Sequence, residues 1–204
     1  IMSAYTELFG LQQYIIKGAR VTSKKGANKG VFYQPAAILQ MEVYHTPMKA
    51  MQMVKDHIHA QTFSTLSFMG SSLGGYYATY LAELFDSKVS LLNPAIEPAR
   101  DLEKYIGEQK SWHQEEVFHF LPEYIDELEE IYVEKSTQAE RYFLLATKGD
   151  EVLDWREMVA KYPGAQQLIL EGGDHAISDY PNYLNQLMQF HFTALASLTH
   201  LKPT

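Results

Sequence analysis

Residues 68–78 read FMGSSLGGYYA, in which two serines and three glycines separate an apolar run from a run with helical spacing. A strand that turns sharply into a helix holds the residue at the turn in a strained conformation, and it needs small residues two positions before and after it. Around Ser72 these positions hold Gly70 and Gly74. Around Ser71 they hold a bulky methionine and a leucine. Ser72 is therefore the serine that this turn can expose as a nucleophile.

The same glycines could instead form a structural turn or a phosphate-binding loop. A Walker loop needs Gly-Lys followed by Ser or Thr, and a dinucleotide loop needs Gly-x-Gly-x-x-Gly; residues 68–78 contain neither. A strand candidate ends at Met69 and a helix candidate begins after Gly74, as a nucleophile turn requires. The start of that helix would place backbone N–H groups and a positive dipole end beside Ser72. We therefore favour a catalytic serine over a structural turn.

Two later turns offer a base and an acid for this serine. A serine hydroxyl needs a nearby base, and the base works best when a third group orients it and stabilises its charge. Asp150 follows a strand-like run in RYFLLATKGDEVLDW, and His175 follows another in QQLILEGGDHAISDY. Both residues are expected at the carboxyl ends of strands, on the same sheet edge as Ser72. The chain order Ser72, Asp150, His175 is the order of the triad in α/β-hydrolases.

Four other carboxylates near these turns are weaker candidates for the acid: Glu151, Asp154, Asp174 and Asp179. Glu151 would point elsewhere if its neighbour faces the site. Asp174 adjoins the base in the chain, where a side chain cannot easily reach the Nδ1 atom of the next residue. Asp154 is better placed to cap the helix that begins at Trp155. We predict Asp150 as the acid and keep Asp154 as the second choice.

Strand-like and helix-like runs alternate along most of the chain, which predicts an α/β fold with a mostly parallel sheet and helices on both faces. Strands are expected at residues 31–36, 62–69, 88–93, 141–147 and 166–171, and helices at residues 47–58, 75–85, 155–162 and 181–198. No internal repeat or low-complexity linker interrupts the chain. A single domain over residues 1–204 is therefore expected.

The alternation breaks between Asn93 and Arg141. Residues 97–140 are acidic and aromatic, are predicted to be mostly helical, and contain no strand-like run. An excursion at the carboxyl ends of the strands could cover a ligand crevice as a lid, or it could be a packed pair of surface helices. Five aromatic residues could line an acyl pocket beneath it: Tyr76, Tyr77, Trp112, Phe118 and Phe120. Aromatic residues at such spacing more often belong to the ordinary core.

Composition narrows the classes of partner. A chain of 204 residues, 46% of them hydrophobic, can bury a substantial core. A formal net charge of −8 argues against nucleic-acid binding and favours a small neutral or apolar ligand. No apolar run approaches the roughly 20 residues of a membrane span, and the opening IMSAYTELFG lacks the layout of a secretory signal. We expect a soluble cytoplasmic protein, and Ile1 ahead of Met2 suggests that the natural start lies elsewhere.

Metal and thiol chemistry are not expected. The chain has no cysteine, so it has no disulfide, no thiolate metal site and no cysteine nucleophile. No His-x-x-x-His or His-Glu-x-x-His pair suggests zinc. Seven of the eight histidines are predicted to be structural or solvated: His45, His57, His59, His113, His119, His191 and His200. The acidic run Asp126 to Glu130 is predicted to be a solvated helix face, so we expect no metal and no cofactor.

Four segments resemble the YqiA-like bacterial esterases, a small α/β-hydrolase family: GSSLGGYYATYLAELF, LLNPAIEPARDLEKYIG, TKGDEVLDWREMVAKY and LILEGGDHAI. The resemblance runs, with gaps, from about Phe63 to the end of the chain. It implies that Ser72 is the nucleophile, Asp150 the acid and His175 the base. It also implies hydrolysis of carboxylic esters or thioesters without a cofactor.

The first third of the chain departs from that family's pattern. The family opens with an apolar strand that runs into a His-Gly-Phe turn, which supplies the second N–H of the oxyanion hole. Residues 1–30 contain no His-Gly dipeptide, and only residues 31–36 and the helix from Pro47 look like the family's second strand and next helix. The resemblance thus assigns one oxyanion donor, the backbone N–H of Leu73, and leaves the second unknown.

Three hypotheses follow from these observations. The first is a serine esterase that cleaves a small-molecule ester with a short to medium acyl chain, or a thioester, through an acyl-enzyme on Ser72. The second is a hydrolase-like binding or scaffold protein with an incomplete oxyanion hole. The third is a different reaction of the same three residues, such as thioester or peptide cleavage. The natural substrate and the oligomeric state are not predicted.

Overall fold

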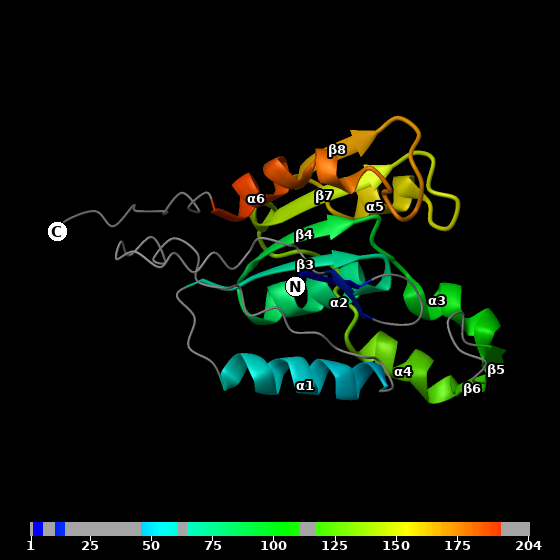
Figure 1. Ribbon diagram of the computed structural model, residues 1–204. Helices are drawn as coiled ribbons and strands as arrows, with labels where there is room; N and C mark the ends of the chain where they lie inside the picture. The colour runs from blue at the N-terminus through cyan, green and yellow to red at the C-terminus, as the bar shows by residue number, and fades with distance from the viewer. Residues whose placement is uncertain (1, 6–10, 15–45, 61–64, 111–116, 193–204) are drawn as a thin grey trace, which may run out of the picture.

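The computed structural model describes residues 2–5, 11–14, 46–60, 65–110 and 117–192 (Figure 1). Its centre is a four-stranded sheet in the order β3-β4-β7-β8. The strands are β3 (Ser67–Ser71), β4 (Lys88–Leu92), β7 (Tyr142–Thr147) and β8 (Gln166–Leu170). All three strand pairs are parallel, so the carboxyl ends of the four strands lie at one edge. The prediction of an α/β fold with a mostly parallel sheet is confirmed.

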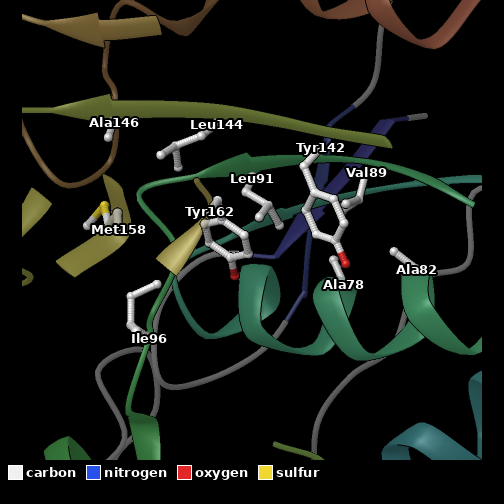
Figure 2. Close-up of a cluster of buried hydrophobic side chains, with 10 residues drawn as sticks. All are labelled: Ala78, Ala82, Val89, Leu91, Ile96, Tyr142, Leu144, Ala146, Met158 and Tyr162. Atoms are coloured by element: carbon white, nitrogen blue, oxygen red, sulfur yellow. The ribbon is translucent and has the colours of Figure 1, made fainter. Parts of the chain in front are cut away.

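Helices cover both faces of this sheet. On one face, α2 (Leu73–Leu84) and α5 (Trp155–Lys161) pack against β4 and β7. Figure 2 shows the side chains between them, with Tyr142 and Leu144 of β7 and Val89 and Leu91 of β4 facing α2. On the other face, α6 (Leu184–Phe192) packs its residues Leu187 and Phe190 against the sheet.

Burial on both faces explains the sequence pattern of the central strands. Every residue of β4 and of β7 is buried, and alternate side chains of β7 belong to opposite faces. Tyr142 and Leu144 face α2, whereas Phe143 and Leu145 face α6. A strand covered on both sides reads as a continuous apolar run, which is why YFLLAT was recognisable as a strand.

A further layer lies outside α2. The helices α1 (Pro47–His59) and α4 (Pro122–Glu130) bury apolar side chains against the outer side of α2. Helix α1 begins as predicted, with Pro47 in its first turn and the Thr46 side chain accepting a hydrogen bond from the Lys49 N–H. Helix α2 is therefore enclosed on both sides.

The excursion between Asn93 and Arg141 is only partly helical. It contains α3 (Pro98–Leu102) and α4, but also an antiparallel pair of strands, β5 (Gly107–Lys110) and β6 (Val117–Phe120). The expectation of no strand in this segment was wrong, because β5 has the polar sequence GEQK, which carries no apolar alternation. Figure 1 shows that α3 lies beyond the end of the sheet toward which the arrowhead of β4 points.

Element boundaries differ slightly from the predicted ones. Strand β3 ends at Ser71 rather than Met69, and α2 begins at Leu73 rather than Gly75. The last helix begins at Leu184, after a short 3-10 turn at Tyr180–Asn182, because Pro181 favours a turn there. Two further 3-10 turns span Glu103–Tyr105 and Ala139–Arg141. An antiparallel pair of strands that was not predicted joins β1 (Met2–Tyr5) to β2 (Leu11–Tyr14). The strand expected at 31–36 and residues 193–198 lie outside the described residues.

Candidate active site

Ser72 occupies a strained turn between β3 and α2. Its φ of 53° and ψ of −128° belong to a region that residues with a side chain rarely adopt. The Ser72 N–H donates to the carbonyl oxygen of Leu92 at 3.0 Å. The Ser72 carbonyl oxygen accepts from the N–H groups of Gly75 and Ala95, each at 2.9 Å. Hydrogen bonds to the end of β4 and to the loop after it therefore hold the strained residue.

The glycines around Ser72 allow the backbone segments to approach each other closely. A Cβ atom added at Gly70 would lie 2.1 Å from the carbonyl oxygen of Gly74. A Cβ atom at Gly75 would lie 2.6 Å from the Cβ of Pro94. Real Cβ atoms essentially never approach other atoms within 3.0 Å, so β3, α2 and the loop after β4 could not pack this way with larger residues.

The structure brings Ser72, His175 and Asp150 together in one hydrogen-bonded chain. The His175 Nε2 atom lies 3.0 Å from the Ser72 Oγ atom. On the other side of the ring, Nδ1 lies 2.8 Å from Oδ2 and 2.9 Å from Oδ1 of Asp150. The side chains of Asp150 and His175 are almost completely buried, with 0% and 2% exposure. Water therefore competes little for these hydrogen bonds.

Asp150 determines which ring nitrogen of His175 carries the proton. An ionised carboxylate only accepts hydrogen bonds, so the imidazole nitrogen beside Asp150 must donate. A neutral His175 then has its proton on Nδ1 and a free lone pair on Nε2, which can accept the hydroxyl proton of Ser72. Asp150 is itself oriented, because its Oδ1 accepts from the N–H groups of Val152 and Leu153 at 2.8 and 2.9 Å.

The other candidate carboxylates bond elsewhere. Asp154 caps α5 by accepting from the Arg156 N–H at 2.9 Å. Asp174 accepts from the N–H and hydroxyl of Ser178, and these hydrogen bonds lower the pKa of its carboxyl. Asp179 accepts from the hydroxyl of a tyrosine in the next turn. Of the five carboxylates weighed from the sequence, Asp150 is the one that contacts the imidazole ring.

Two contacts to the backbone of His175 were not predicted from the sequence. The Glu151 Oε2 atom accepts the backbone N–H of His175 at 3.0 Å. Asn93, fully buried at the end of β4, donates from Nδ2 to the backbone carbonyl oxygen of His175 at 3.0 Å. The sequence signal available for Asn93 was an asparagine directly after the strand-like run KVSLL.

A pocket opens beside Ser72 between the loop after β4, helix α3 and the loop before α5. The buried residues of its lining, which form its floor, are Ser72, Pro94, Ala95, Ile96, Pro98 and Leu102. Its rim is charged. There Arg100 of α3 donates from Nη1 and Nη2 to the two carboxylate oxygens of Glu157 of α5, at 3.1 and 2.9 Å. The pocket thus has an apolar floor next to the serine and an ion pair across part of its mouth.

Of the aromatic residues weighed as a lining for this pocket, those whose side chains the structure describes belong to the ordinary core, the alternative that their spacing favoured. Tyr76, Tyr77 and Phe120 pack instead in the core between α1, α2 and α4, and the Tyr76 hydroxyl donates to the Leu128 carbonyl oxygen at 2.6 Å. Aromatic residues at helical spacing served the packing of α2. Trp112 and the side chain of Phe118 lie outside what the structure describes.

Comparisons with known proteins place the chain in a family. The model of the uncharacterised protein family UPF0227 matches residues 28–192, which is most of the chain. The chain belongs to UPF0227. This is the YqiA-like family that the four sequence segments indicated.

Solved structures with the same fold share little sequence with this UPF0227 chain. The crystal structure of a protein described as a hydrolase, from Agrobacterium vitis S4, aligns with a TM-score of 0.56 and 18% identity over 72% of this chain and 69% of that one. Est1E from Butyrivibrio proteoclasticus aligns with a TM-score of 0.53 and 18% identity over 71% and 69%. The structure of Est1E with bound ferulic acid aligns with a TM-score of 0.55 and 15% identity, over 72% of this chain and 67% of that one. The chain has the α/β-hydrolase fold.

The structure describes one candidate donor for an oxyanion hole. Leu73 is the first residue of α2 and lines the pocket beside Ser72. The first N–H groups of a helix have no acceptor within the helix, so the Leu73 N–H is available to a ligand there. The resemblance implies a second donor in the opening turn, and of residues 1–30 the structure describes only 2–5 and 11–14.

A second serine–histidine pair provides an instructive contrast. In the middle of β4, the fully buried Ser90 has its Oγ atom 2.9 Å from the Nε2 atom of His191 in α6. The His191 Nδ1 atom is buried and has no hydrogen-bond partner in the described part of the chain. Burial, and then the charge of Lys88, lower the pKa of His191 to about 4. Among the described residues this pair has no orienting acid, and Ser90 itself is fully buried.

The described residues show neither a metal-binding cluster nor a membrane-crossing helix. Within the described ranges, no group of three or more His, Asp or Glu side chains is arranged to hold a metal ion. No helix in those ranges has the length and apolar character to cross a membrane.

Proposed function

We propose that this chain is a serine hydrolase that cleaves carboxylic esters with short to medium acyl chains, or thioesters, through an acyl-enzyme on Ser72. The observation that carries the proposal is the hydrogen-bonded chain from Ser72 through His175 to Asp150 at a strained strand-to-helix turn. Ester hydrolysis is also supported by the likeness to Est1E, whose structure was determined with ferulic acid. The three residues need no cofactor for this reaction.

Acylation proceeds in two steps, the attack of Ser72 on the ester and the departure of the alcohol. As the Ser72 Oγ atom bonds to the acyl carbon, its proton moves to Nε2 of His175, and the carbonyl electron pair moves to the oxygen. The Leu73 N–H donates to that oxygen. The intermediate then collapses, the bond to the alcohol oxygen breaks, and His175 returns its proton to the departing alcohol.

Deacylation repeats the sequence with water. The water molecule gives a proton to His175 and bonds to the acyl carbon, and the carboxylic acid leaves as Ser72 recovers its proton. Asp150 keeps the ring oriented and stabilises the imidazolium formed in each half of the reaction. Its two bonds from backbone N–H groups keep the carboxylate in place throughout.

The pocket supports a modest acyl group. Its floor of Ala95, Ile96 and Leu102 is apolar, whereas the Arg100–Glu157 pair stands at its mouth. A chain that remains on the floor buries its methylene groups, at about 0.8 kcal/mol each. A longer chain meets charged groups. We also propose that residues 97–140 form a lid within a single domain, because α3 supplies part of both floor and rim.

The second candidate is a binding or scaffold protein that keeps the three residues but has an incomplete oxyanion hole. It is favoured by the single donor, Leu73, that can be assigned. Loss of one such donor typically reduces turnover by about 10²–10³-fold. Such a protein would react once with an activated ester and then release the acid slowly or not at all.

The proposed function is tested by p-nitrophenyl acetate and butyrate hydrolysis. We expect multiple turnovers by the wild type, background rates for Ser72→Ala, and nearly normal rates for the control Ser71→Ala, with folding of all three checked by circular dichroism. Turnover that persists in Ser72→Ala would refute the assignment. A stoichiometric burst without turnover would favour the binding protein instead.

A further inference from the structure

Asn93 joins three carboxyl ends of the sheet. It directly follows β4, has 0% exposure, and adopts a φ of 40°, a conformation that asparagine tolerates better than most residues. Its Oδ1 atom accepts from the Thr147 N–H, the last of β7, at 2.8 Å. Its Nδ2 atom lies 3.1 Å from the carbonyl oxygen of Asp174 and 3.0 Å from that of His175. One side chain therefore connects β4, β7 and the loop that carries the base.

The orientation of the Asn93 amide follows from its neighbours. The Thr147 N–H can only donate, so the atom facing it must be the amide oxygen. The carbonyl oxygens of Asp174 and His175 can only accept, so the atom facing them must be the NH₂ group. An aspartate at this position would have the same shape but would direct a second oxygen at two carbonyl oxygens.

Glu151 contacts the same peptide segment from the other side. Its Oε2 atom accepts the His175 N–H at 3.0 Å, while Asn93 donates to the His175 carbonyl oxygen. Both main-chain polar groups of the base are thus bound by side chains from two other loops. The ring of His175 must reach Ser72 on one side and Asp150 on the other at the same time, so the position of its backbone matters to both bonds.

We propose that Asn93 and Glu151 are positioning residues that hold His175 through its backbone, so that its ring bridges Ser72 and Asp150. The inference rests on the proposed function, because it concerns the base of that reaction. Neither residue touches the reacting atoms. Their effect on the rate arises from alignment, and a displacement of about 1 Å between reacting groups can reduce a rate about 100-fold.

Four variants separate positioning from general stability. Asn93→Asp keeps the shape and the acceptor but loses both donations, and Asn93→Gly keeps the backbone conformation but removes the side chain. Glu151→Ala removes the acceptor at an exposed residue, so it does not threaten the fold. Glu151→Gln retains an acceptor oxygen. The matched control is Ser90→Ala, which removes a fully buried hydrogen-bonding group from the middle of β4 that bonds to His191 and not to His175.

The readout is p-nitrophenyl butyrate hydrolysis as a function of pH, with stability measured in parallel by urea unfolding. We expect both Asn93 variants and Glu151→Ala to lower kcat about 10- to 100-fold with KM within about twofold. The acidic limb of the pH–rate profile, which reports protonation of the base, should move to lower pH in Asn93→Gly and Glu151→Ala as Asp150 becomes less well aligned, whereas the carboxylate added in Asn93→Asp opposes that shift. Glu151→Gln should recover most of the lost activity, and Ser90→Ala should lose stability but keep kcat and the pH profile.

Two results would overturn the inference in distinguishable ways. If the wild type shows Ser72-dependent turnover but folded Asn93→Asp and Glu151→Ala keep their kcat and pH profile, the positioning role is wrong while the proposed function stands. If the wild type shows no Ser72-dependent turnover, the proposed function fails and the positioning role fails with it. Should the Asn93 variants not fold, the Glu151 pair decides the question alone.

Discussion

Replacing Gly70 by alanine should disrupt the strained turn while leaving the rest of the fold in place. The added Cβ would lie 2.1 Å from the carbonyl oxygen of Gly74, 2.5 Å from its carbonyl carbon and 2.7 Å from the N atom of Gly75. All three are backbone atoms, so no side-chain rotation relieves the contact. Because such contacts are essentially never closer than 3.0 Å, β3 and α2 must separate by about 1 Å.

That separation acts directly on Ser72, which lies between the two segments. Overpacking of this kind destabilises a protein by about 1–3 kcal/mol. A shift of about 1 Å in the serine relative to the base should lower kcat about 100-fold. We therefore expect Gly70→Ala to fold with a lower urea midpoint, and to hydrolyse p-nitrophenyl butyrate at about 1% of the wild-type rate.

The matched control is Gly164→Ala. Gly164 has a φ of 81° in the turn before β8, at the opposite end of that strand from the active site, and a Cβ there would lie 3.2 Å from Ala139. A left-handed alanine costs about 1–2 kcal/mol, so this variant loses comparable stability without moving Ser72. The reasoning would be refuted if Gly70→Ala kept wild-type kcat, or if both variants lost activity in equal measure.

Two further predictions concern charged groups. Burial lowers the pKa of His191 from 6.5 to about 4, so protonation favours the unfolded chain and wild-type stability falls by about 3 kcal/mol from pH 7 to pH 4 through this group. His191→Gln can keep the bond to Ser90 but does not titrate, so its free energy of unfolding in urea should fall by about 3 kcal/mol less between pH 7 and pH 4 than that of the wild type. An equal loss of stability in both proteins would contradict this prediction. Arg100→Ala should open the rim and raise kcat/KM for p-nitrophenyl hexanoate relative to butyrate several-fold, whereas Arg156→Ala should not; an unchanged ratio would show that the Arg100–Glu157 pair does not limit chain length.

The fold was predictable because its physical causes leave local patterns. Central strands covered on both faces read as apolar runs, and the close approach at the turn demands glycines at fixed spacing around Ser72. Asp150 and His175 were predictable because each follows a recognisable strand, and parallel strands bring their carboxyl ends to one edge. Each inference needed only a short window of sequence.

The supporting contacts had no such pattern. Asn93 and His175 are 82 residues apart, and Glu151 and His175 are 24 apart, so their hydrogen bonds depend on the completed sheet. A single polar residue carries no periodicity that would reveal a partner at that distance. The β5–β6 hairpin was missed for a related reason, since the polar segment GEQK pairs through its backbone and shows no apolar alternation.

The central claim, that His175 and Asp150 activate Ser72, is tested most directly by covalent labelling. An alkyl fluorophosphonate reacts with activated serines, and intact mass followed by peptide mapping identifies the labelled residue. We predict one adduct, on Ser72, that forms far more slowly in His175→Ala, with Ser90 unlabelled despite its bond to His191. An adduct on another residue, or a labelling rate that does not depend on His175, would contradict the account.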